Sequence, residues 1–236
     1  MKGTSLQQEV TAFGVYVEGW MGQLPALALP EAVTDPKKTA IVCVDVIQGF
    51  CYEGPLSSPR VAGIVEPIRQ LFERAWARGV RHILLTQDTH EPDAVEFAQW
   101  PPHCVRGTAE AETVEAFKRL PFFEQVTVFE KNSIASGLNT GLNRWIEEHP
   151  EVETFIVVGD CTDLCTYQLA MHLRLDANAR QLRRRVIVPA DCVQTYDYSI
   201  EAAREQGGLP HPGDVLHAVF LYHMQLNGVE VVGNIQ

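Results

Sequence analysis

The chain has 236 residues, of which 46% are hydrophobic and 21% charged, and its formal net charge is −11. A chain of this length can bury one sizeable core. The acidic balance argues against nucleic acid or an anionic membrane as a partner, because phosphate binding needs a clustered excess of lysine and arginine. No apolar run approaches the ~20 residues that span a bilayer, and the N-terminus lacks the pattern of a secretion signal. We therefore expect a soluble, cytoplasmic protein.

The first 37 residues show no regular periodicity, and Pro25, Pro30 and Pro36 interrupt them. We expect residues 1–37 to form an irregular arm packed on the body, and residues 38–236 to form a single domain. The six cysteines of the chain are too sparse for a disulfide framework. Their spacing fits neither a Cys-x-x-Cys redox pair nor a structural zinc site, so free thiols are expected.

From Thr39 onward, short continuous apolar runs alternate with helical patterns. Such runs are typical of strands that are covered on both faces. They predict strands at 40–44, 82–85, 126–129, 155–158, 186–188 and 229–232. Helices are predicted from Val61 to a C-cap at Gly79, over 137–148, after Cys165 and over 211–225. The alternation predicts an α/β fold: a doubly wound, mostly parallel six-stranded sheet with helices on both faces, in three layers.

Polar side chains follow four of the predicted strands. They are Asp45 after the first, Asp88 and His90 after the second, Lys131 after the third and Cys165 after the fourth. In a parallel sheet these strand ends meet at one edge, where ligands bind. A cysteine nucleophile, an aspartate that acts as base and then as acid, and a lysine as electrostatic partner suit amide hydrolysis through a thioester. Singly, Asp45 could cap a turn and Lys131 could be solvated, but their joint placement favours the catalytic interpretation.

Cys165 lies where an apolar run breaks at Gly159 and a helical pattern begins. The N–H groups and partial positive charge of a helix N-terminus favour a thiolate and can hold an oxyanion. Thr162 or Asp163 is the expected N-cap of that helix. The alternative is a small, inert cysteine buried in a packed strand-to-helix turn.

A second group of polar residues follows the predicted strand at 82–85. Asp88 and His90 are two apart on an extended segment and point the same way, and His103 arrives from a loop bent by Pro101 and Pro102. Two imidazoles with one or two carboxylates suit a catalytic divalent metal such as Zn²⁺, Fe²⁺ or Mn²⁺. The alternative is that both histidines are polar loop residues that hydrogen-bond to their surroundings.

Taken together, these motifs resemble the isochorismatase-like cysteine hydrolases, and among them the nicotinamidases, including those of plants. The resemblance covers about residues 39–232. It rests on 44–50, on 88–90 with 101–108, on 130–131, on 159–165 and on a C-terminal region with His211–Pro212 and Leu221–Tyr222. Two segments near the expected substrate pocket, Gln48–Gly49 and 134–138, depart from the family pattern, which leaves the acyl group of the substrate open.

The resemblance implies Asp45, Lys131 and Cys165 as the catalytic triad. It also implies a cis peptide between Asp160 and Cys161, which would aim the backbone N–H groups of Cys161 and Cys165 at an oxyanion.

For the metal, the resemblance implies Asp88, His90 and His103 as ligands, with Glu96 as an additional acidic ligand, and Zn²⁺ as the expected ion. Phe50 and Trp100 are candidates to line the faces of the substrate ring, although ordinary packing would explain them equally well.

The expected function is that of an amidohydrolase of the nicotinamidase type. It would convert nicotinamide or a similar small carboxamide to the acid and ammonia through a cysteine thioester. Gly159 stands alone without a Gly-x-Gly-x-x-Gly motif, so no organic cofactor is expected. We expect a homo-oligomer. The alternatives are a related hydrolase of a carbamoyl or ureido compound, of the N-carbamoylsarcosine or ureidoacrylate type, and a non-catalytic α/β binding protein.

Overall fold

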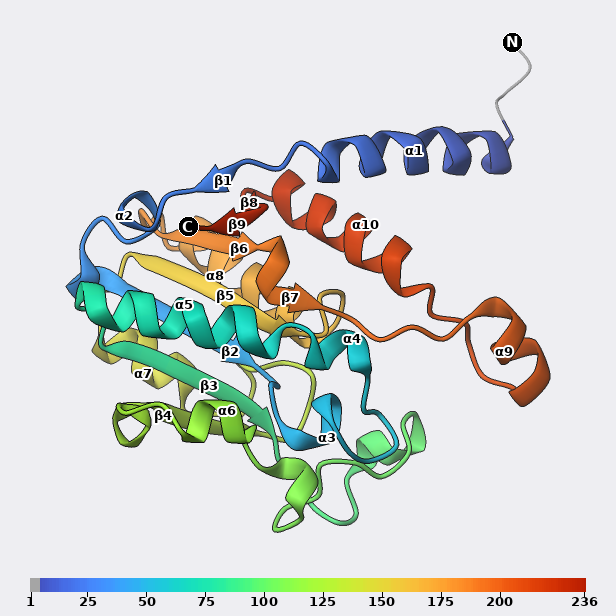
Figure 1. Ribbon diagram of the computed structural model, residues 1–236, viewed down its shortest axis with the longest axis horizontal. Coiled ribbons are helices and arrows are strands. Elements are labelled where there is room, and N and C mark those ends of the chain that lie inside the picture. Colours follow the sequence, from blue (N-terminus) through green and yellow to red (C-terminus); the bar gives the residue numbers. More distant parts are fainter. Residues whose placement is uncertain (1–4) are drawn as a thin grey trace.

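All six predicted strands pair in one parallel sheet in the computed structural model, which describes residues 5–236 (Figure 1). Their spatial order is β4 (Thr127–Lys131), β3 (His82–Asp88), β2 (Thr39–Val44), β5 (Thr154–Asp160), β6 (Arg185–Pro189) and β8 (Glu230–Val232). A short strand that the sequence did not predict, β7 (Val193–Gln194), pairs with the end of β5. The chain runs outward from β2 to β4 on one side and from β5 to β8 on the other. The winding therefore reverses between β2 and β5, the position at which doubly wound sheets bind ligands.

Helices cover both faces of the sheet, which confirms the three-layer α/β fold. One face carries α3 (Gln48–Cys51), α4 (Pro59–Ala62), α5 (Val65–Arg78) and α6 (Glu115–Lys118). The other carries α7 (Leu142–Glu148), α8 (Cys165–Ala179) and α10 (Gly213–Leu226). The remaining elements are α1 (Leu6–Met21), β1 (Ala26–Leu27), α2 (Leu29–Ala32), α9 (Ile200–Gln206), β9 (Asn234–Ile235) and the short 3₁₀ turns η1 (Pro36–Lys38), η2 (Val95–Ala98), η3 (Ala109–Ala111), η4 (Phe123–Gln125) and η5 (Ala190–Cys192).

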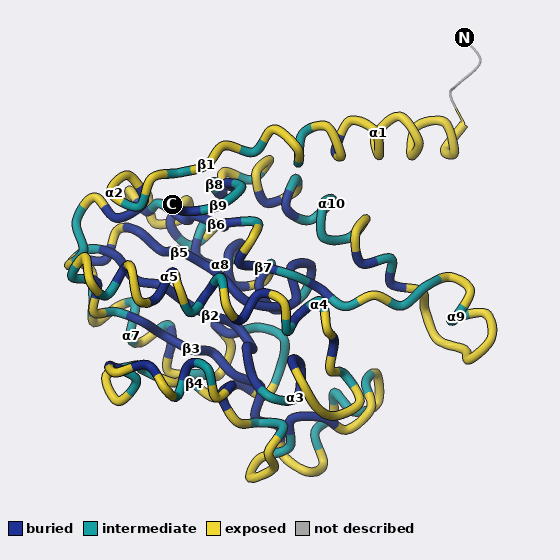
Figure 2. The backbone as a smooth tube through the Cα atoms, viewed as in Figure 1, coloured by how far each residue is buried: buried dark blue, intermediate teal, exposed yellow. Residues whose placement is uncertain are grey.

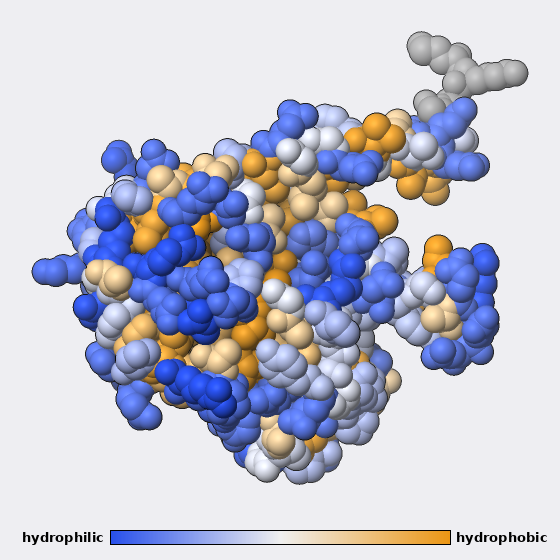
Figure 3. Space-filling view, viewed as in Figure 1, coloured by the Kyte–Doolittle hydropathy of each residue, from blue (hydrophilic) through white to orange (hydrophobic). Residues whose placement is uncertain are grey.

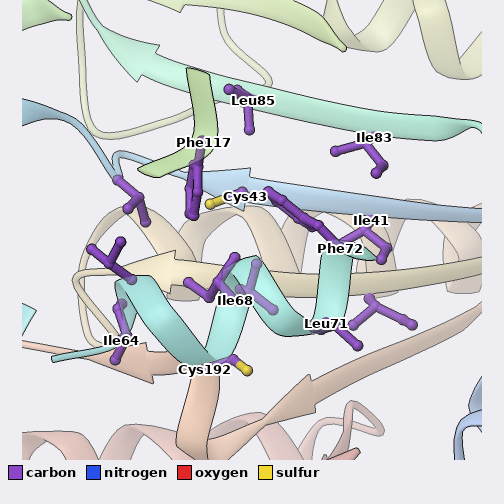
Figure 4. Packing of buried hydrophobic residues seen from close by; sticks show 14 of the residues in the cluster. Ile41, Cys43, Ile64, Ile68, Leu71, Phe72, Ile83, Leu85, Phe117 and Cys192 are labelled. Carbon is purple, nitrogen blue, oxygen red and sulfur yellow. The ribbon is translucent and has the colours of Figure 1, made fainter. Parts of the chain in front are cut away.

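The core has two halves because successive side chains of a strand point to opposite faces of the sheet. On β2, Ile41 and Cys43 join the cluster under α5, whereas Ala40, Val42 and Val44 join the cluster under α8. Figure 4 shows the first cluster, in which side chains of α5 meet those of β2 and β3. Both faces of the central strands are buried, as Figure 2 also shows, which explains why they read as continuous apolar runs.

The helix boundaries differ from the prediction in three places. The pattern predicted from Val61 to Gly79 divides into α4 and α5, although Gly79 is the C-cap of α5 as expected, with φ +107°. The helix predicted over 137–148 begins only at Leu142, because the glycines and polar residues before it favour turns. The N-cap of α8 is Leu164 rather than Thr162 or Asp163, whose side chains are bound by histidines elsewhere in the fold.

The prediction of an irregular N-terminal arm is corrected by α1. Ser5 begins this helix with a capping box, in which its hydroxyl accepts from the Gln8 N–H and the Gln8 side chain accepts from the Ser5 N–H. Phe13, Tyr16 and Trp20 each contact Tyr222 of α10, with ring centroids 5.3–5.8 Å apart.

Most of α1 is exposed, and Figure 3 shows apolar side chains on its surface. Leu6, Val10, Phe13, Val17 and Trp20 follow a helical period, but Val15 on the opposite side of the helix blurs the apolar stripe. Among residues 5–236, no helix is both long and apolar enough to cross a membrane. The cytoplasmic location, the homo-oligomer and the division into an arm and one domain stay predictions.

Gly159 of β5 lies against the backbone of its register partner Val44 on β2, with no room for a side chain. Its φ is +114°, and a Cβ built there would lie 2.0 Å from the Val44 carbonyl oxygen. We expect Gly159→Ala to lower the free energy of unfolding by more than about 3 kcal/mol, because strand backbone cannot move aside cheaply. Gly107, with φ +80° and no heavy atom within 4 Å of the added Cβ, is the matched control. Gly107→Ala should cost only about 1–2 kcal/mol. Equal losses of unfolding free energy in Gly159→Ala and Gly107→Ala, measured by urea denaturation, would contradict the close approach of Val44 to Gly159.

Candidate active site

The carboxyl ends of β2, β3 and β4 bring two carboxylates to one ammonium. Asp88 and Lys131 are register partners on adjacent strands, and Lys131 Nζ lies 2.6 Å from Asp88 Oδ1. Asp45 directly follows β2, and its Oδ2 lies 2.7 Å from the same Nζ while its Oδ1 accepts from the Asp88 N–H at 2.8 Å. The strand-end prediction therefore brought together residues that are adjacent in the structure.

Cys165, the first residue of α8, completes this cluster. Its sulfur lies 3.7 Å from Lys131 Nζ, and the sulfur and the carboxylate oxygens of Asp45 and Asp88 lie within 4.8 Å of one another. All four residues are buried, and the Lys131 side chain is fully so. Two carboxylates, one ammonium and one thiol thus share a site that bulk water does not reach.

Burial and mutual charge set the protonation of this cluster. Burial, followed by the neighbouring Asp88 carboxylate, raises the pKa of Asp45 to about 7, although Lys131 opposes the shift. Burial would also raise the pKa of Asp88, but Lys131 and His90 outweigh it and hold that pKa below its usual range. Burial raises the pKa of the Cys165 thiol well above its usual range, against the effect of Lys131. The helix start therefore does not by itself produce a thiolate, and the thiol needs a proton acceptor such as Asp45.

The turn of residues 161–164, between β5 and α8, begins at one predicted oxyanion donor, Cys161, and leads directly to the other, Cys165. The peptide bond between Asp160 and Cys161 is cis. Within residues 5–236, neither the Cys161 N–H nor the Cys165 N–H donates a hydrogen bond to another protein group. The Cys165 N–H opens α8 and so has no intrahelical partner. The Cys161 N–H lies in the turn before the helix, so both N–H groups are free to bind a ligand oxygen.

Asp88, His90 and His103 form a second group beside this cluster, with ligand atoms within 4.8 Å of one another. His90 Nδ1 contacts Asn132 Oδ1 at 2.9 Å, and His103 Nδ1 contacts the Pro101 carbonyl oxygen at 2.8 Å. Because both partners are acceptors, a neutral ring at either position would carry its proton on Nδ1 and keep the Nε2 lone pair for a metal. His90 Nε2 is buried without a hydrogen-bond partner among the described residues. This donor set fits a divalent metal.

The other predicted residues lie around these two groups. Glu96 is half-buried in η2 and is not part of the metal-binding group, although its charge acts on His90. Phe50 is buried beside His103, with ring centroids 5.7 Å apart. Trp100 is half-buried and meets Tyr196 edge-on at 6.3 Å. The structure thus brings together three of the four predicted ligands and places the two aromatic candidates against different partners.

Sequence reasoning missed the residues that orient this site. Asn132 directly follows Lys131, and its position at a strand end was the available signal. His211 bonds the Asp163 carboxylate through Nε2 at 2.8 Å. The sequence pattern marked His211 as part of a family-like region but gave no partner for it, because the two residues are 48 positions apart.

Comparison with known proteins agrees with the fold. The model of the isochorismatase domain family matches residues 39–210. Nicotinamidase 1 of Arabidopsis thaliana is 28% identical over 228 residues, which cover 87% of this chain and 90% of that protein.

Two solved structures have the same fold. The pyrazinamidase of Pyrococcus horikoshii, in complex with zinc, has a TM-score of 0.64 and 22% identity, with 83% of this chain and 98% of that chain covered. The N-carbamoylsarcosine amidase of Thermoplasma acidophilum has a TM-score of 0.61 and 23% identity, with 83% and 95% covered. Since the family model spans most of the chain, the protein belongs to the isochorismatase family and is a hydrolase of that family, similar to the nicotinamidases.

Proposed function

We propose that the protein hydrolyses nicotinamide, or a similar small ring carboxamide, to the carboxylic acid and ammonia through a thioester on Cys165. The observation that carries the proposal is the buried cluster in which Lys131 Nζ contacts Asp45, Asp88 and the Cys165 sulfur. A thiol beside a carboxylate that titrates near neutral pH is suited to nucleophilic attack coupled to proton transfer. The similarity to a plant nicotinamidase supports the choice of substrate.

In the first half of the reaction, Asp45 accepts the thiol proton as the Cys165 sulfur bonds to the carboxamide carbon. Asp45 Oδ2 faces the Lys131 ammonium at 2.7 Å, and a carboxylate has further lone pairs that can take this proton. The oxygen of the tetrahedral adduct accepts hydrogen bonds from the N–H groups of Cys161 and Cys165. The C–N bond then breaks, and Asp45 returns the proton to the departing nitrogen, which leaves as ammonia.

In the second half, water hydrolyses the thioester. Asp45 takes a proton from the water, whose oxygen bonds to the acyl carbon, and the C–S bond breaks. The acid leaves and the sulfur recovers the proton. Lys131 remains charged throughout, because Asp45 and Asp88 raise its pKa despite the effect of burial. It holds the Asp45 carboxylate in place at each step.

Asp88, His90 and His103 would hold the metal beside this cluster. A bound divalent ion, for which we propose Zn²⁺, would supply a Lewis acid able to bind a ring nitrogen of the substrate. Phe50, next to His103, is proposed to pack against the ring.

A substrate panel tests the proposed function. Ammonia release should be measured from nicotinamide, pyrazinamide, N-carbamoylsarcosine and ureidoacrylate, each with and without a chelator. We expect the highest kcat/KM for one of the two ring carboxamides. A higher kcat/KM for N-carbamoylsarcosine or ureidoacrylate would show that the substrate is a carbamoyl or ureido compound rather than a ring carboxamide. No ammonia release from any of the four compounds would favour the non-catalytic alternative.

Removing a proposed metal ligand should remove both metal and activity. We expect His90→Ala and His103→Ala to lose bound metal, measured by elemental analysis, and to lose at least ~10-fold in turnover. His223 is exposed on α10 and serves as the matched control, so His223→Ala should keep both. Unchanged metal content in both ligand variants would show that the ligands are wrongly assigned.

A further inference from the structure

The two side chains expected to cap α8 are turned away from the helix and bound by histidines. Asp163 Oδ2 lies 2.8 Å from His211 Nε2, and Thr162 Oγ1 lies 2.8 Å from His217 Nδ1 on α10. Leu164 occupies the N-cap position without a side-chain hydrogen bond. The turn of residues 161–164 is therefore held by contacts from distant parts of the chain rather than by its own capping.

His211 faces an oxygen acceptor on each side. Its Nδ1 lies 3.0 Å from the Tyr196 carbonyl oxygen, and its Nε2 meets the Asp163 carboxylate. Both ring nitrogens of His211 thus face acceptors, and the Nε2 contact ties the ring to the Asp163 carboxylate. Burial acts to raise the pKa of Asp163, but the contact with His211 contributes to outweighing it, and that pKa is lowered. The Asp163 side chain is only 5% exposed and the His211 side chain 11%.

His211 is itself fixed by its surroundings. Its ring stacks on Tyr196, with centroids 3.7 Å apart and planes 14° apart. Residues 196–211 leave the body, form α9 and return, and the backbones of Tyr198 and His211 pair at the base of this excursion (Figure 1). The Asp163–His211 pair thus connects the base of the excursion to the turn that precedes Cys165.

We propose that Asp163 and His211 are positioning residues, whose hydrogen-bonded contact holds the turn of residues 161–164 so that the Cys161 and Cys165 N–H groups point at the same oxygen. Asp163 is two residues from each of the two donors, so a displacement of its carboxylate rotates the peptide units between them. The inference rests on the proposed function in taking Cys165 as the nucleophile. In other enzymes, loss of a single oxyanion donor lowers kcat by about 10²–10³-fold. Misalignment of the Cys161 and Cys165 N–H groups should therefore have a measurable effect.

Two reactions of Cys165 separate alignment of the donors from reactivity of the thiol. Acylation by 4-nitrophenyl acetate passes through an oxyanion, with sulfur bonding to the carbonyl carbon and nitrophenolate leaving. Alkylation by iodoacetamide forms a C–S bond and expels iodide without developing charge on an oxygen. Both rates are measured on the full chain, with the modified cysteine identified by peptide mass mapping. Neither reaction depends on which amide is the natural substrate.

In Asp163→Ala, we expect acylation to fall by about 10- to 100-fold and alkylation to change by less than about 3-fold. Asp163→Asn should stay within about 3-fold of wild type in both, because the amide can donate to the Nε2 of a neutral His211. His211→Gln should also retain most of the acylation rate, since its amide can donate to Asp163. Asp214, an exposed carboxylate on α10 that pairs with Arg60, gives the control Asp214→Ala, with no change expected.

Equal acylation rates in wild type and Asp163→Ala would overturn the role of the pair. An equal loss in both reactions would also overturn it, because the pair would then support the thiol or the fold rather than the donors. If Asp163→Ala does not fold, Asp163→Asn takes its place in the test. A large loss of acylation without a loss of alkylation in that variant would contradict the proposal. If wild type shows no acylation of Cys165, the proposed nucleophile fails and this inference fails with it.

Discussion

Replacing Cys165 with alanine is expected to lower kcat for the carboxamide substrate by about 10⁴-fold or more. The reason is that no other nucleophile lies in the buried cluster of Asp45, Lys131 and Cys165. The fold should be unaffected, because the Cys165 sulfur contacts the Lys131 ammonium and is not a purely apolar core contact. Ammonia release and thermal unfolding, measured on the same preparation, separate the two effects.

Cys161 gives the matched control for this variant. It is also buried, and its proposed role belongs to the backbone N–H rather than to the thiol. Cys161→Ala keeps that N–H and should retain kcat within about 10-fold. Full activity in Cys165→Ala, or an equal loss in both variants, would contradict the assignment of Cys165 as nucleophile.

Replacing Lys131 with methionine should have the largest effect on stability. The ammonium lies between Asp45 and Asp88, at 2.7 and 2.6 Å, and all three side chains are almost completely buried. Without it, two carboxylates are left in a buried site with no counter-charge. Removing one partner of a buried ion pair typically costs about 3–5 kcal/mol. We expect a loss of this size in urea denaturation, together with loss of turnover.

Lys118 provides the comparison, because it also contacts two carboxylates but is partly exposed. Its Nζ lies 2.8 Å from Glu112 and 3.6 Å from Glu115. Exposed pairs contribute about 0–1 kcal/mol, so Lys118→Met should cost no more than that. A similarly small cost for Lys131→Met would contradict the view that the Lys131 ammonium stabilises this cluster.

The parts of the site that lie at strand ends could be predicted from the sequence. Continuous apolar runs mark buried parallel strands, and parallel strands bring their carboxyl ends to one edge. That rule alone predicts that Asp45, Asp88, Lys131 and Cys165 are neighbours, and the contacts in the structure agree. The prediction needed no knowledge of the loops.

The parts of the site that depend on long loops could not be predicted in the same way. Glu96 lies outside the metal-binding group because η2 sets its direction, and nothing in the residue spacing encodes that turn. Asp163 has the local preference of an N-cap, but His211 binds it instead. Such contacts depend on where the chain returns after many residues. Local propensity does not contain that information.

The thioester is the central claim, and its direct observation is the most decisive measurement. Wild-type protein should be mixed with nicotinamide, quenched in acid within the first turnovers and digested for mass spectrometry. We predict that the peptide containing Cys165 carries the mass of the pyridinecarbonyl group, and that Cys165→Ala carries none. Ammonia release by wild type with no acylated Cys165 peptide, under quench conditions in which an authentic thioester survives, would contradict the account.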